Sequence, residues 1–253
     1  MQALILAGGK GRRLRPYTVS IPKPLLPVGE RPILDILLTR LAREGFRTVY
    51  ISIGYLGEMI RAYVGTGSRY GLRIRYLEES RPLGTAGPLA LLPKPKNPFF
   101  LLNGDLLLDV DFPAMMKVHR EKKNVCTICT YRKEEQVQLG VLRLEDEIVK
   151  EYVEKPSYSF HISTGVYVFH PKVCSQIPGG KVLDLPALVN RLLRNKEKVG
   201  VYHHDGIWMD LGRFDDYARA EEVFRSDPER FLGRIRGPRR GKARRHAGTE
   251  VRR

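Results

Sequence analysis

Residues 6–27 read LAGGKGRRLRPYTVSIPKPLLP and lie between a short apolar run at residues 2–6 and a segment with helical spacing at residues 31–45. The apolar run predicts a strand, so this stretch is expected to connect the first strand to the first helix. Glycines in such a connection let the backbone approach a ligand closely, and their successive exposed N–H groups form a cradle for anions.

Positive side chains surround the glycines of this loop. Arginine offers a planar fork that binds a phosphate through two parallel hydrogen bonds. Lys23 stands between two prolines, and a residue before proline is restricted to extended backbone, so its ammonium should be held in a fixed place. The pattern predicts a phosphate-binding loop, and a charged surface loop without a ligand is the alternative. The cations concerned are Lys10, Arg12, Arg13, Arg15 and Lys23.

Two other glycine motifs do not fit this loop. The P-loop requires G-x-x-x-x-G-K-[ST], whereas here the lysine lies between glycines and no Ser or Thr follows it. The dinucleotide fingerprint requires G-x-G-x-x-G and an acidic residue about 20 positions later, at the end of the second strand. Leu14 and the apolar second strand at residues 49–53 depart from that pattern.

The composition is that of a globular protein. A chain of 253 residues with 42% hydrophobic residues can bury one sizeable core. No apolar run approaches the roughly 18 residues that a membrane helix needs, and no basic region precedes the N-terminal apolar stretch as in a signal peptide. Three cysteines form no even disulfide framework, which favours a reducing compartment, so we expect a cytoplasmic protein.

The net charge of +16 is unevenly distributed. Residues 226–253 hold ten Lys/Arg and three Asp/Glu, a net of +7, so the first 225 residues carry +9. A basic tail is compatible with nucleic acid or an acidic membrane surface, but this one has almost no apolar or aromatic side chains with which to fold or to stack on bases. We expect one domain at residues 1–225 and a disordered tail at residues 226–253. The composition of the tail disfavours a nucleic-acid partner, and a basic nucleic-acid-binding protein is kept as an alternative because of the net charge of +16.

Strands and helices alternate in the first half of the chain, which predicts a mostly parallel sheet between helices. Ligands of such sheets bind beyond the carboxyl ends of the strands, where the glycine loop, Glu79 and Asp105 should meet. From residue 124 onwards, short strands and tight turns predict a β-rich half. The predicted strands are residues 2–6, 49–53, 72–77, 99–102, 124–131, 140–144, 148–153, 163–169, 199–203 and 207–209, the last two forming a hairpin around Asp205-Gly206; the predicted helices are residues 31–45, 58–64, 84–92, 185–194 and one carrying Phe214, Tyr217, Ala220 and Phe224.

Cys126 and Cys129 form a C-x-x-C motif on a predicted strand. Residues three apart on a strand point to opposite faces, so this pair cannot share a metal ion, and both are expected to be buried. His203 and His204 diverge in the same way and are interpreted as ordinary side chains.

Seven separated motifs share one order along residues 2–225: A-G-G-x-G-x-R-L, P-K-P-L-L-P-V, P-L-G-T-A-G, N-G-D, E-K-P, T-G-V-Y and W-x-D-L-G. This order resembles the nucleotidyltransferases that activate sugar 1-phosphates, and residues 25–92 look most similar to the mannose-1-phosphate guanylyltransferase branch. The resemblance implies a Rossmann-like fold and attack of a sugar 1-phosphate on the α-phosphorus of a nucleoside triphosphate, with pyrophosphate leaving. A phosphate monoester is already a dianion at neutral pH, so this reaction needs no general base.

The resemblance also implies a set of site residues. Arg13, Lys23 and Asp105 would be catalytic, and Asp105 and Asp210 would hold Mg²⁺. The nucleoside triphosphate would bind at Leu6, Ala7, Gly8, Gly9, Gly11, Arg13, Glu79, Gly84, Thr85 and Asn103, and the sugar phosphate at Lys23, Gly140, Glu154, Lys155, Thr164 and Gly165.

Glu79 stands where the family contacts the edge of the base. An ionised carboxylate only accepts hydrogen bonds, and guanine offers two adjacent donors, which favours GTP. The same reaction with UTP or dTTP is the alternative, because Ser163-Thr164-Gly165 looks more like the glucose-1-phosphate thymidylyltransferase branch. A glycosyltransferase that uses a nucleotide-sugar is the nearest rival enzyme, although it would not need Arg13 and Lys23 together. A homo-oligomer is left open.

Overall fold

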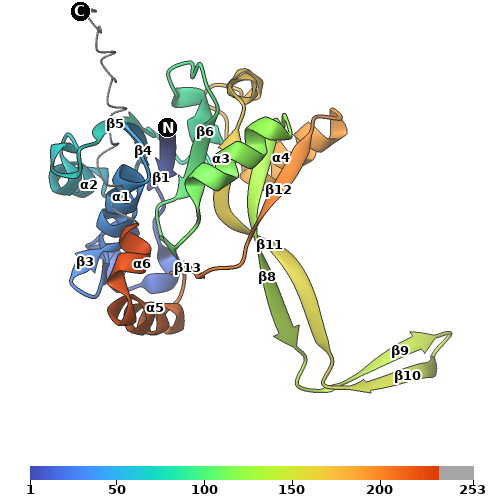
Figure 1. Ribbon diagram of the computed structural model, residues 1–253. Helices are drawn as coiled ribbons and strands as arrows, with labels where there is room; N and C mark the ends of the chain where they lie inside the picture. The colour runs from blue at the N-terminus through green and yellow to red at the C-terminus, as the bar shows by residue number, and fades with distance from the viewer. Residues whose placement is uncertain (234–253) are drawn as a thin grey trace, which may run out of the picture.

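The computed structural model describes residues 1–233, and its centre is a seven-stranded, mostly parallel sheet (Figure 1). Only β11 runs antiparallel to its neighbours, which confirms the predicted fold class. In spatial order the strands are β12 (Val199–His204), β8 (Cys126–Gln136), β11 (Ser157–Phe169), β6 (Phe99–Asn103), β1 (Gln2–Leu6), β4 (Thr48–Ile53) and β5 (Arg73–Glu78).

Helices cover both faces of this sheet. Alternate residues of the central strands therefore pack into two different cores: Ile5 of β1 into one, Leu4 into the other. Because both faces are buried, β1 is apolar throughout rather than alternating. The first face packs against α1 (Ile33–Arg43), α2 (Gly57–Val64) and α3 (Phe112–Glu121), and the second against α4 (Leu185–Arg194) and the 3₁₀ turns η5 (Gly87–Leu91) and η6 (Pro171–Gln176).

A third layer lies on the outer side of α1. It contains α5 (Phe214–Ser226) and α6 (Pro228–Leu232), together with the two-stranded pairs β7 (Leu106–Leu108) with β13 (Trp208–Asp210) and β2 (Pro27–Val28) with β3 (Arg31–Pro32). Phe231 of α6 is fully buried in this layer. The buried Arg40 of α1 donates to the carbonyl oxygens of Arg230 (2.7 Å) and Val110 (2.8 Å), which ties α6 to the domain.

The folded region therefore continues past the boundary at residue 225 that the sequence predicted. Helix α6 forms within this range, because Asp227 caps it through the N–H of Arg230 and its Phe231 and Leu232 side chains are buried. The rest of the predicted tail lies outside the described residues.

A long two-stranded ribbon projects from the sheet, and we call residues 132–161 the arm (Figure 1). It consists of the outer halves of β8 and β11 and of the hairpin β9 (Gly140–Glu145) and β10 (Ile148–Glu154). The inner halves of β8 and β11 are buried, whereas nearly every side chain of the arm is exposed.

Several local predictions need correction. Helix α3 was not predicted. The segment expected to be a helix at residues 84–92 contains only the 3₁₀ turn η5. The hairpin expected around Asp205-Gly206 does not form, because β12 pairs with β8 and β13 pairs with β7.

The prediction for the C-x-x-C motif is confirmed. Cys126 and Cys129 are both buried, and they lie in the cores on opposite faces of the sheet. Over the described residues, no helix combines the length and apolar character needed to cross a bilayer.

Candidate active site

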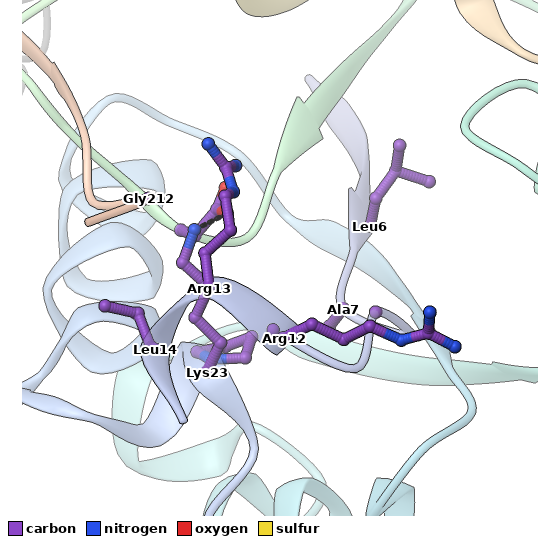
Figure 2. Close-up of a pocket in the computed structure, with 11 residues that line it drawn as sticks. Leu6, Ala7, Arg12, Arg13, Leu14, Lys23 and Gly212 are labelled. Carbon is purple, nitrogen blue, oxygen red and sulfur yellow. Dashed lines mark hydrogen bonds and ion pairs between the residues drawn. The ribbon is translucent and has the colours of Figure 1, made fainter. Parts of the chain in front are cut away.

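The glycine loop follows β1 at the carboxyl end of the parallel strands and lines a cavity of about 280 Å³ (Figure 2). The other walls come from 3₁₀ turns after the loop, from the turn between β6 and β7, and from the segment after β13. The lining residues are Leu6, Ala7, Gly9, Gly11, Arg12, Arg13, Leu14, Lys23, Pro24, Asp105 and Gly212.

The loop is fixed by contacts that its sequence alone does not show. Gly11 adopts a φ of +57°, a region that favours glycine. The buried Thr18 donates its hydroxyl hydrogen to the carbonyl oxygen of Gly11 (2.9 Å), and Thr18 would clash with a Cβ at that position. On the other side, the N–H of Tyr55 donates to the carbonyl oxygen of Gly8 (3.3 Å). The loop is thus anchored at both ends.

Two aspartates and one lysine meet at one wall of the cavity. Asp105 precedes β7 and Asp210 ends β13, and pairing of these strands places the carboxylates side by side. The ammonium of Lys23, 8% exposed, forms an ion pair with Asp105 and lies 3.6 Å from Asp210 Oδ1. Burial and the negative charge of Asp105 raise the pKa of Asp210, while Lys23 and Arg13 act in the opposite direction.

The two arginines after the glycines point in different directions. Figure 2 shows Arg13 rising toward Gly212, whereas Arg12 extends to the side on which Leu6 and Ala7 lie. A Cβ at position 212 would lie 3.0 Å from the Arg13 guanidinium, so glycine there leaves room for that group. Among the described residues, neither arginine forms an ion pair with a carboxylate. Both guanidinium groups are available to an anion.

A second cavity of about 620 Å³ lies across the same loop and contains Glu79. Its Oε1 accepts from the hydroxyl of the buried Ser52 (2.6 Å), and its Oε2 accepts from the N–H of Leu83 (3.0 Å). Gly8, Gly9, Gly11 and Arg12 also line this cavity, and three of these residues are shared with the first one. The structure therefore brings Glu79 to the glycine loop, as the sequence suggested.

Gly84 and Thr85 have a different role from the one expected. The Thr85 hydroxyl accepts from the N–H of Leu185, and the Thr85 N–H donates to Asp184 Oδ1, so this pair fastens the start of α4. Gly84 has a φ of +75° and packs against the carbonyl of Leu183. Neither residue lines the two cavities.

The residues expected to bind the sugar phosphate lie in separate parts of the structure. Thr164 is 1% exposed and donates to the carbonyl oxygen of Cys129 (3.0 Å), so its hydroxyl faces the interior rather than a ligand. Gly165 lies against the side chain of Asn103, near the first cavity at the end of β6. Gly140, Glu154 and Lys155 lie on the arm and line neither cavity of the site.

Three residues of the site were missed by sequence reasoning: Thr18, Ser52 and Gly212. Gly212 belongs to the W-x-D-L-G motif, so its motif was a usable signal. Thr18 and Ser52 act through hydrogen bonds to Gly11 and Glu79, which are 7 and 27 residues away, and no sequence pattern indicated either partner.

Comparison with known proteins places the chain in a family. Residues 2–226 match the family described as "Nucleotidyl transferase". The chain belongs to the nucleotidyl transferase family. It is 35% identical over 242 residues to a UTP–glucose-1-phosphate uridylyltransferase of Synechocystis (87% of this chain, 62% of that protein). It is 33% identical over 255 residues to a mannose-1-phosphate guanylyltransferase catalytic subunit beta of Danio rerio (93% and 71%).

The fold of this nucleotidyl transferase also matches solved structures. HddC from Yersinia pseudotuberculosis superposes with a TM-score of 0.70 at 23% identity, covering 88% of this chain and 99% of that one. A glucose-1-phosphate thymidylyltransferase structure from Bacillus anthracis gives the same TM-score at 24% identity, covering 92% and 100%. These similarities confirm the Rossmann-like fold. The chain spans about three fifths to seven tenths of the length of the two curated relatives named above.

The acidic pair of this nucleotidyl transferase fits a divalent cation. Two carboxylates held together are hard oxygen ligands, and Mg²⁺ is typically bound by one or two carboxylates plus substrate phosphates and water. Burial and, after it, the negative charge of Asp105 raise the pKa of Asp210, and a cation between the two carboxylates would oppose both effects. Within residues 1–233, no group of three or more His, Cys, Asp or Glu side chains is arranged to hold a metal ion.

Proposed function

We propose that this nucleotidyl transferase transfers a nucleoside monophosphate from a nucleoside triphosphate to a sugar 1-phosphate. The observation that carries the proposal is the meeting of Lys23, Asp105 and Asp210 beside a glycine loop with two unpaired arginines. Both curated relatives named above act on a hexose 1-phosphate according to their names, one with UTP and the other as a guanylyltransferase.

Each part of the site has a role in this reaction. The glycine loop would hold the triphosphate through its N–H groups, with Arg13 next to the phosphates that carry the developing charge. Asp105 and Asp210 would hold Mg²⁺, which neutralises charge on the phosphates. Lys23 would bind the incoming sugar phosphate. An oxygen of that phosphate attacks the α-phosphorus, the bond to the bridging oxygen of the β-phosphate breaks, and pyrophosphate leaves with the bonding electrons.

The chemistry needs alignment more than proton transfer. The attacking phosphate is a dianion near pH 7, so no residue has to remove a proton from it. Lys23 begins a 3₁₀ turn (Lys23–Leu25) instead of lying on the extended backbone that its place before proline predicted, because the N–H of Leu25 bonds back to the carbonyl of Pro22. The ion pair with Asp105 holds its ammonium, and the Thr18 hydroxyl holds the glycine loop, so both are positioned for alignment.

The two cavities on either side of the loop suggest where each end of the nucleotide would lie. With the phosphates in the cavity that contains Lys23, the base would occupy the cavity of Glu79. A carboxylate with one accepting position left on each oxygen suits the two adjacent donors of guanine, so GTP is the proposed nucleotide. The three free cysteines support a cytoplasmic location.

Pyrophosphate release with each nucleoside triphosphate against a panel of sugar 1-phosphates tests the proposal. We expect release only when both substrates and Mg²⁺ are present, with GTP used best. Absence of release with every pair, or release from the triphosphate alone at the same rate, would contradict the proposed transfer.

A further inference from the structure

The arm is the least covered part of the described chain. Of the seventeen exposed large hydrophobic residues among residues 1–233, nine lie on it. An isolated two-stranded ribbon is only marginally stable in water, so a ribbon of this length with an apolar surface is expected to pack against something. The nine residues are Leu139, Leu142, Leu144, Ile148, Val149, Tyr152, Val153, Tyr158 and Phe160.

The two faces of the hairpin differ in how many charged side chains they carry. Residues that pair across two strands share a face, and Leu142 pairs with Tyr152 while Leu144 pairs with Val149. These four side chains form the apolar face of the hairpin. The opposite face carries the ion pair of Arg143 with Glu151 (3.1 Å), together with Val153, which pairs with Val141, and Ile148, which pairs with Glu145.

The apolar face also carries part of the expected sugar-binding motif. Gly140 pairs with Glu154, two positions along from the pair of Leu142 and Tyr152, so Glu154 lies at the end of the apolar face. The Tyr152 hydroxyl donates to Glu154 Oε2 (3.3 Å), and the Tyr152 ring lies against Gly140. Whatever covers this face will lie next to Glu154 and Lys155.

A second group of exposed apolar side chains lies on segments next to the catalytic cavity. Tyr17, Val19, Ile21 and Phe214 are exposed, and we call them the rim patch. The rings of Tyr17 and Phe214 are in edge contact, with centroids 5.6 Å apart. Ile21 lies two residues before Lys23 and Phe214 two residues after Gly212, so the patch borders the cavity that these residues line. The other four exposed large hydrophobics are Met59, Val182, Leu193 and Val201.

The charges of the arm and of the loop next to the rim patch are complementary. The arm contains five Lys/Arg and seven Asp/Glu, a net of −2, in a chain of net +16, so all other residues carry +18. Within the described residues, the loop cations next to the rim patch, Lys10, Arg12, Arg13 and Arg15, have no carboxylate partner. An acidic, apolar arm therefore fits a basic, apolar rim.

The arm does not reach the rim patch of its own chain. Figure 1 shows it extending away from the body, with the hairpin of β9 and β10 turned to one side at its end, and β8 and β11 are paired continuously from Thr130–Ser163 to Gln136–Ser157. We propose that two copies of this chain exchange arms: the apolar face of each arm packs on the rim patch of the other copy and delivers Glu154 and Lys155 to that copy's site. This inference rests on the proposed function, because it completes the sugar-phosphate site.

Mixed dimers of two defective variants test the exchange. Asp210→Asn removes a proposed metal ligand and leaves the arm intact, whereas Lys155→Ala alters the arm and leaves the cavity intact. Each variant alone should be nearly inactive. A mixed dimer, isolated with two different affinity tags, has one site built from an intact cavity and an intact arm, so we expect about half of the wild-type activity. An inactive mixed dimer, or a fully active Lys155→Ala enzyme, would overturn the proposal.

Molecular mass provides a test that does not depend on activity. By light scattering, the wild type should have twice the 28.9 kDa of one chain. The double variant Leu142→Ser/Tyr152→Ser on the apolar face should be monomeric, whereas the matched variant Arg143→Ser/Glu151→Ser on the opposite face should stay dimeric. A monomeric wild type, or equal masses for the two variants, contradicts the arm exchange. A dimer that obeys this pattern but releases no pyrophosphate with any substrate would contradict the proposed function instead.

Discussion

Glu79→Gln is the most informative single substitution, because the structure fixes what the amide can and cannot replace. The carboxylate accepts from Ser52 with one oxygen and from Leu83 N–H with the other. A glutamine can keep both contacts, since its oxygen accepts from Leu83 N–H and its NH₂ donates to the Ser52 hydroxyl oxygen. The loop after β5 should therefore stay in place.

The substitution has a larger effect on the hydrogen-bonding positions that residue 79 offers to a base. The glutamate retains one accepting position on each oxygen, enough for two adjacent guanine donors, whereas the glutamine offers one acceptor beside one donor. A two-hydrogen-bond contact to a base is worth about 1–3 kcal/mol of discrimination, or roughly ten- to a hundredfold. We expect the ratio of kcat/KM for GTP to that for UTP or dTTP to fall by about this factor.

The assay is pyrophosphate release at subsaturating nucleotide, because the base lies away from the reacting phosphorus and affects binding in the transition state and ground state alike. Ser52→Ala is the matched control: it keeps the charge of Glu79 but removes one of the two hydrogen bonds that hold it. Its preference for GTP should fall less than that of the glutamine variant. A wild type that prefers UTP or dTTP, or an unaltered ratio in Glu79→Gln, would refute the assignment of Glu79 to guanine.

Further predictions concern the rest of the site and the fold. Asp210→Asn should keep its circular dichroism spectrum but lose turnover by orders of magnitude at every Mg²⁺ concentration; full activity would exclude it as a metal ligand. Lys23→Ala should lower kcat and raise the KM for sugar phosphate together, and unchanged values of both would reduce it to a structural cation. Thr85→Ala should lower the urea midpoint by the equivalent of about 1 kcal/mol and leave the KM for nucleotide unchanged, because Thr85 caps α4. Burial by itself would raise the pKa of Asp109, but hydrogen bonds from His204, Arg230 and the Ile207 N–H outweigh it and set the pKa at about 2; the stability from this group, present above about pH 4, should be lost between about pH 4 and 2 in the wild type but not in Asp109→Asn, as urea unfolding at each pH will show.

The glycine loop and the alternation of strands and helices around it could be predicted because their sequence signals are local. β1, β4, β5 and β6 each read as a short apolar or alternating run, and the burial of Cys126 and Cys129 on opposite faces follows from the period of a strand. Helix α3 had local signals that were overlooked: Asp111 caps it through the N–H of Ala114, and proline stands in its first turn.

What could not be predicted depends on partners far away in the sequence. The Asp205-Gly206 pair is a hairpin signal, yet β12 finds a better partner in β8, because joining the edge of a large sheet satisfies its backbone groups. Likewise, the resemblance implied that Thr164 binds the sugar phosphate, but in the structure its hydroxyl donates to the Cys129 carbonyl inside the sheet. Motif order identified the family, whereas the direction of single side chains needed the structure.

Because Lys23 lies between two aspartates, binding of Mg²⁺ at the aspartates is coupled to binding of the nucleoside triphosphate. These three side chains together carry a net charge of −1, which opposes a triphosphate on the adjacent loop. A bound divalent cation would reverse the local charge to +1, and the ammonium would no longer be needed to neutralise the carboxylates. Nucleotide affinity should therefore rise steeply with Mg²⁺, and by thermodynamic linkage Mg²⁺ should bind more tightly when nucleotide is present. The lysine is thus expected to become available to a second phosphate only after the cation has arrived.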